Sequence, residues 1–208
     1  MGRSRNRRQG GSRRSTDRRQ ADHFTRQAKE EGYAARSVFK LAEMDARWRL
    51  VPRGGRMVDL GCAPGSWSRY LRQRGGDAAV LVGVDLTEVA DFPGIFLCES
   101  VYDVGAARLR ELLGGPADLV VSDMAPSTTG ARTTDHLQQV ALAEQALALA
   151  RELLAPGGAF VAKVFDGGDA PAYVAAVRAC FSDFRRARPQ ATRTESREFF
   201  VVARGYAG

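Results

Sequence analysis

Acidic residues close three short apolar runs that the sequence predicts to be strands. Asp59 lies inside an Asp-Leu-Gly triplet, Asp85 directly follows an apolar run, and Asp123 follows another after a single serine. Parallel strands bring their carboxyl ends to one edge of a sheet, and ligands bind beyond that edge near the point where the strand order reverses. We therefore expect these carboxylates to face a common site.

A glycine-rich turn, Gly61-Cys62-Ala63-Pro64-Gly65, follows the first run and precedes a predicted helix. Such a turn lets the backbone approach a ligand, and an acid about 20 residues later can bind ribose hydroxyls. Asp85 has this spacing from Gly65, although a cap or loop acid would look the same. The turn lacks the middle glycine with which dinucleotide-binding turns approach a pyrophosphate. It therefore suits a cofactor without phosphate that carries an adenosine and a sulfonium.

Lys163 interrupts the apolar run 159–165, which is also predicted to be a strand. A buried lysine is unfavourable unless it is paired. Asp123 ends the neighbouring candidate strand, so we expect an Asp–Lys pair at the same edge of the sheet. The residues alone leave open whether that pair is structural or takes part in chemistry.

Five segments resemble the FtsJ family of ribose 2′-O-methyltransferases, in the family's order and spacing, over about residues 24–204. They are YAARSVFKL (33–41), DLGCAPGSWS (59–68), SDMAP (122–126), LAPGGAFVAKVF (154–165) and SREFFVVA (196–203). The resemblance implies an enzyme that transfers a methyl group from S-adenosylmethionine to a ribose 2′-hydroxyl of RNA. Bacterial members that methylate a uridine of 23S (large-subunit) ribosomal RNA are similar in length, which favours that substrate.

The resemblance also implies which residues form the site. The catalytic tetrad would be Lys40, Asp123, Lys163 and Glu198. The cofactor residues would be Asp59, Gly61, Ala63, Pro64, Gly65, Trp67, Asp85, Asp103 and Asp123. Within this set, we expect the Trp67 ring to pack beside the turn. The stretch 99–103 departs from the family's Gly-Asp-Phe, so the acid near the adenine could be Asp103, which we favour, or Glu99.

Two roles stay open for Lys163. Methyl transfer from a sulfonium is an in-line displacement that depends on positioning, and a ribose hydroxyl must lose its proton to a base. Lys163 could be that base if burial or the charge of Lys40 favours its neutral form. Asp123 and Glu198 favour the charged form, which would instead orient the hydroxyl and stabilise a developing alkoxide.

The residue at position 127 helps to predict whether the ribose or the base of a nucleotide is methylated. Amino-methylating enzymes carry an aromatic ring at this place, where it stacks on a flipped base, whereas this chain has Ser127. The absent ring favours the ribose. The FtsJ family usually has asparagine there, so the role of Ser127 is open.

Basic and aromatic residues before the turn predict the RNA contacts. Residues 36–49 have helical spacing with Ser37 as a possible cap, and Arg36 and Lys40 would then share one face, with Tyr33 one turn earlier. Residues 1–20 hold eight arginines and one aspartate, so their net charge of +7 equals that of the whole chain. We expect them to be a disordered arm that binds RNA phosphates, or a solubilising tail.

From residue 21 to 208, strands and helices alternate. The strand-like runs are 57–60, 79–84, 95–97, 118–122, 159–165 and 198–202. Helices are expected near 36–49, 104–113, 135–154 and 170–180, and one more is expected to begin near residue 66. This alternation predicts one α/β domain with a doubly wound, mostly parallel sheet and helices on both faces. The resemblance implies seven strands in the Rossmann-like class I methyltransferase fold.

Composition excludes several classes of protein. No apolar run reaches the roughly 18 residues of a membrane span, and three scattered cysteines with two histidines make a zinc or other metal site improbable. We expect a cytoplasmic monomer. The alternatives are a transfer RNA ribose 2′-O-methyltransferase, a nicotinamide-dependent oxidoreductase on the same architecture, and a non-catalytic RNA-binding assembly factor. The missing glycine argues against the oxidoreductase, and the complete tetrad argues against the assembly factor.

Overall fold

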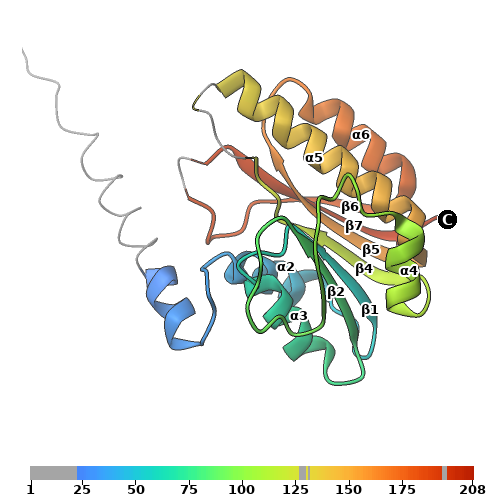
Figure 1. Ribbon diagram of the computed structural model, residues 1–208. Coiled ribbons are helices and arrows are strands. Elements are labelled where there is room, and N and C mark those ends of the chain that lie inside the picture. Colours follow the sequence, from blue (N-terminus) through green and yellow to red (C-terminus); the bar gives the residue numbers. More distant parts are fainter. Residues whose placement is uncertain (1–22, 127–129, 131, 194–195) are drawn as a thin grey trace, which may run out of the picture.

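A computed structural model describes residues 23–126, 130, 132–193 and 196–208. In this part of the chain, a seven-stranded sheet has the order β3-β2-β1-β4-β5-β7-β6 (Figure 1). The strands are β1 (Arg56–Leu60), β2 (Val80–Asp85), β3 (Ile95–Cys98), β4 (Ala117–Ser122), β5 (Leu154–Phe165), β6 (Phe181–Ala187) and β7 (Glu198–Tyr206). The labelled helices are α2 (Val38–Trp48), α3 (Ser66–Gly75), α4 (Ala106–Leu113), α5 (Arg132–Leu153) and α6 (Ala170–Cys180), and a further helical stretch, residues 23–30, precedes α2.

The sheet is parallel from β3 to β5, and β7 runs antiparallel to both β5 and β6. The predicted doubly wound, mostly parallel α/β fold is therefore confirmed. The chain enters the centre of the sheet at β1, builds outward to β3, and returns to place β4 on the other side of β1. This reversal puts the ends of β1, β2 and β4, with their three acids, around one edge.

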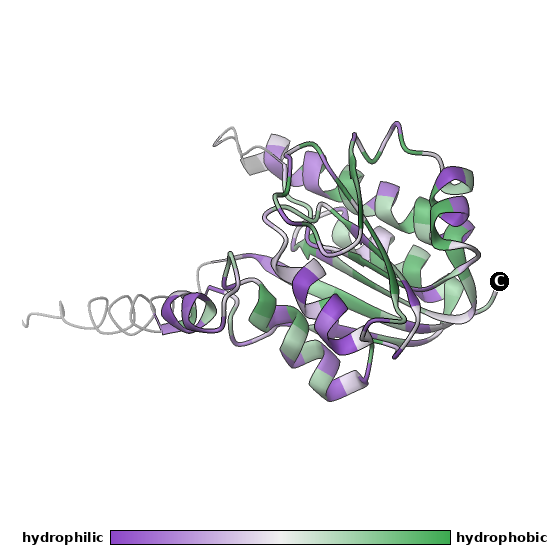
Figure 2. Cartoon of the chain, turned by 60° about the horizontal axis from the view of Figure 1, so that its bottom comes forward, coloured by the Kyte–Doolittle hydropathy of each residue, from purple (hydrophilic) through white to green (hydrophobic). Residues whose placement is uncertain are grey.

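Helices cover both faces of the sheet. On one face, Leu41 of α2 and Leu71 of α3 pack with Phe200 of β7. On the other face, the core includes Leu109 of α4 and Val177 of α6. Figure 2 shows the apolar strands between helices that turn their hydrophilic residues outward. Because both faces are covered, the central strands are continuous apolar runs in the sequence.

Several predicted boundaries were wrong, and one strand was missed. Helix α2 begins at Val38, and Ser37 stands at its N-cap without a side-chain hydrogen bond. Helix α5 begins at Arg132 rather than at residue 135. It ends at Leu153, so Pro156-Gly157-Gly158 lies inside β5, where the pairing with β4 shifts register. Residues 181–187, which the sequence did not suggest as a strand, form edge strand β6.

The predicted tail, residues 1–20, lies outside the described residues, so its boundary with the domain stays a prediction. Among the described helices, none has the length and apolar character needed to cross a membrane. The described residues also hold no group of three or more histidine, cysteine or acidic side chains that could bind a metal ion.

Candidate active site

The two antiparallel strands β5 and β7 place Lys163 and Glu198 on one face of the sheet. Lys163 pairs with Phe200, and Phe165 pairs with Glu198. Directly opposed side chains of antiparallel strands lie on the same face, and Phe200 is buried in the core beneath α2 and α3. Lys163 and Glu198 therefore point toward the helix that carries Lys40.

The tetrad forms two lysine–acid pairs. The Lys40 ammonium lies 2.5 Å from Glu198 Oε1 and 5.5 Å from the centre of the Phe200 ring. Lys163 Nζ donates to the Asp123 carbonyl oxygen at 2.6 Å and lies 3.2 Å from Asp123 Oδ1. The predicted Asp–Lys pair is thus present, and Lys163 is only 7% exposed. No described residue donates a hydrogen bond to Asp123 Oδ1, so its contact with Lys163 is an ion pair only.

The charges of both lysines act on Glu198. Burial raises the pKa of this carboxyl, but the charge and hydrogen bond of Lys40 lower it, and the charge of Lys163 lowers it further. The balance holds the Glu198 pKa below its usual value, so the carboxylate stays ionised. The influence of Lys163 on Glu198 shows that the two pairs form one electrostatic cluster.

The turn between β1 and α3 requires its glycines. Gly61 has a φ of +74°, and a Cβ there would lie 2.3 Å from Met124 Cγ. Gly65 has a φ of +93°, and a Cβ there would lie 2.9 Å from Val89 Cγ1. Both residues occupy a conformation that favours glycine, and both approach neighbouring chain closely. The turn is therefore packed against the segment that follows Asp123.

Asp85, at the end of β2, holds this turn. Its Oδ2 accepts a hydrogen bond from Ala63 N at 2.9 Å, and its Oδ1 accepts one from Thr87 N at 2.8 Å. The carboxylate thus fixes the middle of the glycine turn and the loop that leaves β2. Leu86, the next residue, is 76% exposed and presents an apolar surface beside it.

Asp59 lies beneath the turn. It is 1% exposed, its Oδ2 accepts a hydrogen bond from Ser68 Oγ at 2.5 Å, and its Oδ1 has no partner among the described residues. Burial raises the pKa of Asp59 to about 7, against the opposing Ser68 hydrogen bond, and the charges of Asp123 and Asp85 add to the rise. The three strand-end acids therefore lie close enough to interact.

A known family matches most of the chain. The FtsJ-like methyltransferase family model covers residues 33–206. The chain belongs to this family. The methyltransferase is 47% identical over 187 residues to the ribosomal RNA large subunit methyltransferase E of Granulibacter bethesdensis, covering 89% of this chain and 80% of that protein. It is 42% identical over 204 residues to the protein of the same name from Zymomonas mobilis, covering 97% and 92%.

A solved structure confirms the fold of the methyltransferase. A ribosomal RNA methyltransferase from Plasmodium falciparum, described as putative, superposes with a TM-score of 0.76, at 22% identity, over 85% of this chain and 100% of that one. At this identity the likeness concerns the fold alone.

Trp67 joins the glycine turn to the tetrad side of the methyltransferase. Its indole Nε1 donates to the Ser37 carbonyl oxygen at 2.8 Å, and its ring lies 5.8 Å from that of Phe200. The ring is buried. Trp67 therefore ties the start of α3, directly after the glycine turn, to the start of α2.

The two acids considered for the adenine side differ in their contacts. Glu99 accepts two hydrogen bonds from Arg108, at 2.6 and 2.8 Å. Asp103 is exposed, and within the described residues its carboxylate accepts no hydrogen bond, although its backbone N donates to the Ser100 carbonyl oxygen. Asp103 is therefore the acid without a competing partner, and its contact with the cofactor stays a prediction.

The predicted helical face of Tyr33, Arg36 and Lys40 was wrong. Tyr33 and Arg36 both precede α2. Arg36 lies in the turn that leads into the helix, in which the Phe39 and Lys40 backbone nitrogens donate to the carbonyl oxygens three residues earlier. The Tyr33 hydroxyl donates to Gln73 Oε1 at 2.5 Å, so α3 fixes its ring edge. Ser127, from which the sequence favoured methylation of the ribose over the base, lies outside the described residues.

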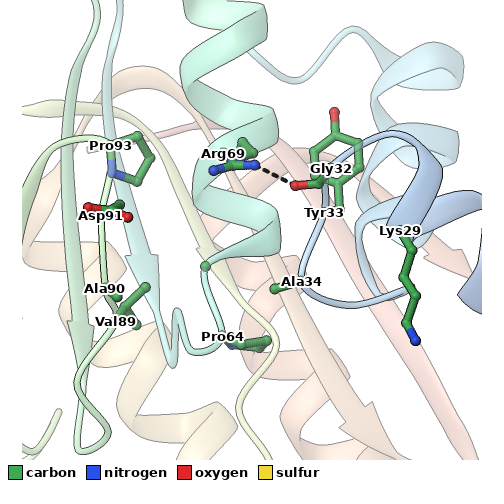
Figure 3. Close-up of a pocket in the computed structure, with 11 residues that line it drawn as sticks. Lys29, Gly32, Tyr33, Ala34, Pro64, Arg69, Val89, Ala90, Asp91 and Pro93 are labelled. Atoms are coloured by element: carbon green, nitrogen blue, oxygen red, sulfur yellow. Dashed lines mark hydrogen bonds between the residues drawn. The ribbon is translucent and has the colours of Figure 1, made fainter.

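A cavity of about 360 Å³ lies beside the glycine turn (Figure 3), and none of the four tetrad residues lines it. Figure 3 shows the Arg69 side chain of α3 between the loop that follows β2 and the segment that holds Tyr33. Arg69 donates to the Gly32 carbonyl oxygen. The cavity is lined by Lys29, Gly32, Tyr33, Ala34, Pro64, Gly65, Arg69, Val89, Ala90, Asp91 and Pro93.

Sequence reasoning missed three residues of this region. Ser68 supports Asp59, Leu86 flanks Asp85, and Gln139 of α5 binds the backbone on both sides of Val164. Leu86 could have been found as the exposed apolar residue after a strand-ending acid. Nothing in the sequence indicated the contacts of Gln139, which is one polar residue in a helix rich in alanine and leucine.

Proposed function

We propose that this methyltransferase transfers a methyl group from S-adenosylmethionine to a ribose 2′-hydroxyl of large-subunit ribosomal RNA, with a uridine as the target. The observation that carries the proposal is the pair of lysine–acid contacts, Lys40–Glu198 and Lys163–Asp123, at the sheet edge next to the glycine turn. The name of the 47% identical relative from Granulibacter bethesdensis supports the RNA substrate.

The residues at the turn fit S-adenosylmethionine. Asp85 offers a carboxylate to ribose hydroxyls, and the exposed Leu86 offers an apolar surface to a purine. The interacting carboxylates of Asp59, Asp85 and Asp123 favour a cation, such as a sulfonium, over a pyrophosphate. When bound, the cofactor supplies the methyl group, whose bond to sulfur breaks as the bond to the ribose oxygen forms.

Lys163 is the group that we place against the 2′-hydroxyl. Its ammonium has three N–H donors, of which the Asp123 carbonyl oxygen accepts one. The Asp123 carboxylate forms an ion pair with the ammonium at 3.2 Å without accepting a hydrogen bond. A further donor can hold the ribose oxygen in line for attack. The contacts with Asp123 favour the charged amine, so orientation is the role that they support first, and proton acceptance requires loss of a proton from Lys163.

Lys163→Arg separates these two roles. Arginine keeps the positive charge and does not deprotonate in proteins, so a variant that binds cofactor normally and still methylates would assign orientation to this position. An inactive variant with normal cofactor binding would assign proton acceptance.

Lys40 and Glu198 complete the site as a neutral pair. Glu198 is held ionised by Lys40 and Lys163, so it adds a fixed negative charge behind both ammonium groups. We propose that this pair sets the field at Lys163 and the path of the RNA strand. Tyr33 and Arg36, which lie just before α2, are proposed to contact RNA, together with the arginine-rich residues 1–20. We also propose that the enzyme acts in the cytoplasm as a monomer.

Methyl transfer to purified RNA tests the proposal. The wild-type protein, labelled S-adenosylmethionine and either unmethylated large ribosomal subunits or transfer RNA are incubated, and the nucleosides are identified by mass spectrometry. We expect label in a 2′-O-methylated nucleoside from the large subunit. Label on a base would contradict the proposed ribose target, and preferential labelling of transfer RNA would favour transfer RNA as the substrate.

A further inference from the structure

The end of β5 extends beyond its neighbour β4. The last pairing between these strands joins Ser122 to Ala162, and β5 continues to Phe165. On the other side, β7 pairs with β5 as far as Phe165. Within the described residues, the β4 side of β5 therefore has no strand partner from Lys163 to Phe165, where the proposed catalytic lysine projects.

The side chain of Gln139 fills this place. Gln139 is 1% exposed, its Nε2 donates to the Lys163 carbonyl oxygen at 2.7 Å, and its Oε1 accepts from Phe165 N at 2.7 Å. In a pair of parallel strands, a residue of one strand donates its N–H to the carbonyl oxygen before the residue that it faces, and its own carbonyl oxygen accepts from the N–H after that residue. The carboxamide of Gln139 makes this pattern around Val164, as a residue of an extended β4 would.

This contact fixes the backbone of a residue whose side chain is already held. The chain leaves β4 at Asp123, and the helix that comes next, α5, carries Gln139. Asp123 holds the ammonium of Lys163, while Gln139 holds its backbone. The lysine is therefore fixed at both ends, and loss of the carboxamide would leave a buried carbonyl and N–H without partners.

We infer that Gln139 is a positioning residue for methyl transfer: it acts through Lys163 by holding the end of β5 in strand geometry. The inference rests on the proposed function. Because a small misplacement of a reacting group costs much of the rate, removing this contact should slow the chemical step while the cofactor turn, on the other side of β4, keeps its affinity.

Gln139→Met is the direct test, because methionine has a similar length and lacks both hydrogen bonds. Two glutamines of the same helix give matched controls. Gln138 is exposed, and Gln145 donates to the Val101 carbonyl oxygen at 2.8 Å, away from β5. Gln138→Met should change nothing, and Gln145→Met should lower the melting temperature without slowing methylation.

The readouts are the single-turnover methylation rate at saturating RNA and cofactor, the cofactor Kd and the melting temperature. We expect Gln139→Met to lower the rate roughly 10- to 100-fold with a cofactor Kd near that of the wild type. If Gln139→Met does not fold, Gln139→Glu, which keeps the acceptor for Phe165 N, should show the same selective loss of rate to a smaller degree.

The outcomes separate the two claims. A wild-type protein that does not methylate ribose contradicts the proposed function and the positioning role with it. An active wild type with an equally active Gln139→Met overturns the positioning role alone. A rate that falls only as far as it does in Gln145→Met at equal loss of stability also overturns it, because the effect would then be one of folding.

Discussion

At the scale of single residues, both lysines of the tetrad lie beside acids, Lys163 buried and Lys40 mostly covered. Lys163 is 7% exposed and Lys40 is 12% exposed, and each lies against an acid from another element. Taking a charge out of water is costly unless it is paired. The pairs therefore keep two ammonium groups at one sheet edge, and removal of any one member should alter the charge balance of the other three.

Asp85→Ala tests the proposed role of the glycine turn in cofactor binding. The substitution removes the acceptor of Ala63 N and Thr87 N and the proposed partner of the ribose hydroxyls. We expect cofactor binding to weaken by roughly 1.5–3 kcal/mol, as for a hydrogen bond to a charged group. Isothermal calorimetry measures this change, with Glu88→Ala, at an exposed acid, as the control. An unchanged affinity in Asp85→Ala would contradict the assignment.

Asp59→Asn tests the raised pKa beneath the turn. Burial lifts the folded-state pKa of Asp59 to about 7 from an ordinary value of 3.8. The folded protein thus binds this proton more tightly than the unfolded chain does. The associated stability is fully present below the unfolded pKa and is lost as pH rises toward 7, with a slope of at most about 1.4 kcal/mol per pH unit.

Asparagine cannot titrate, so Asp59→Asn does not lose this contribution as pH rises. The free energy of unfolding of the variant minus that of the wild type should therefore increase between about pH 4 and about pH 7. Above that pH, the difference should be constant. Urea denaturation across this range measures both proteins. Parallel stability curves for the two would mean that Asp59 keeps an ordinary pKa.

At the scale of elements, one aspartate joins the end of α2 to the next loop and to α3. Asp45 Oδ1 accepts from Leu50 N and Val51 N at 2.8 and 2.9 Å. Its Oδ2 accepts from Tyr70 Oη at 2.8 Å and from Arg74 Nε at 3.2 Å, both on α3. The buried carboxylate therefore holds the end of α2 and the side of α3 together, behind Lys40 and the glycine turn.

Asp45→Ala should lower the free energy of unfolding by roughly 3 kcal/mol or more, because one buried and three part-buried hydrogen bonds lose their charged acceptor. Thermal and urea denaturation measure the loss. Asp77→Ala, at an exposed acid, is the matched control and should be neutral. A loss below about 1 kcal/mol in Asp45→Ala would show that water replaces this acceptor readily.

The sequence predicted the elements better than their ends. Apolar runs identified the central strands because both faces of the sheet are covered. Edge strand β6 was missed because it carries charged residues, such as Arg185 and Arg186, which edge strands tolerate. The expected helix 135–154 and strand 159–165 left Pro156 between two elements, whereas it lies in β5 next to a register shift.

For the site, the sequence placed acids at strand ends and indicated the Asp123–Lys163 pair, which the structure confirms. The resemblance supplied the other members of the tetrad. Contacts that depend on tertiary packing could not be predicted, such as the hydrogen bonds of Gln139 to β5. The turn before α2 was also missed, because helical spacing continues through Arg36 although the helix begins at Val38.

For the whole molecule, charge is divided unevenly along the chain. Residues 1–20 carry a net charge of +7, and the remaining residues have equal numbers of basic and acidic groups. Long-range attraction to RNA should therefore depend on these first residues.

Deleting residues 1–20 should weaken RNA binding and flatten its salt dependence, by up to about 0.7–0.9 in logarithmic slope per lost phosphate contact. Cofactor affinity should be unchanged, because every residue of the proposed cofactor site lies later in the chain. Salt-titrated binding of full-length and shortened protein to large-subunit RNA measures the effect. Equal slopes would leave these residues a solubilising role only.

The proposed chemistry is tested most directly by comparing the wild type with Lys163→Ala on large ribosomal subunits, with mass spectrometry of the RNA nucleosides and calorimetry of the cofactor. We predict one 2′-O-methylated nucleoside with the wild type, none with Lys163→Ala, and similar cofactor affinity for both. Equal methylation by the two proteins, or a methyl group on a base, would contradict the proposed role of Lys163 or the ribose target.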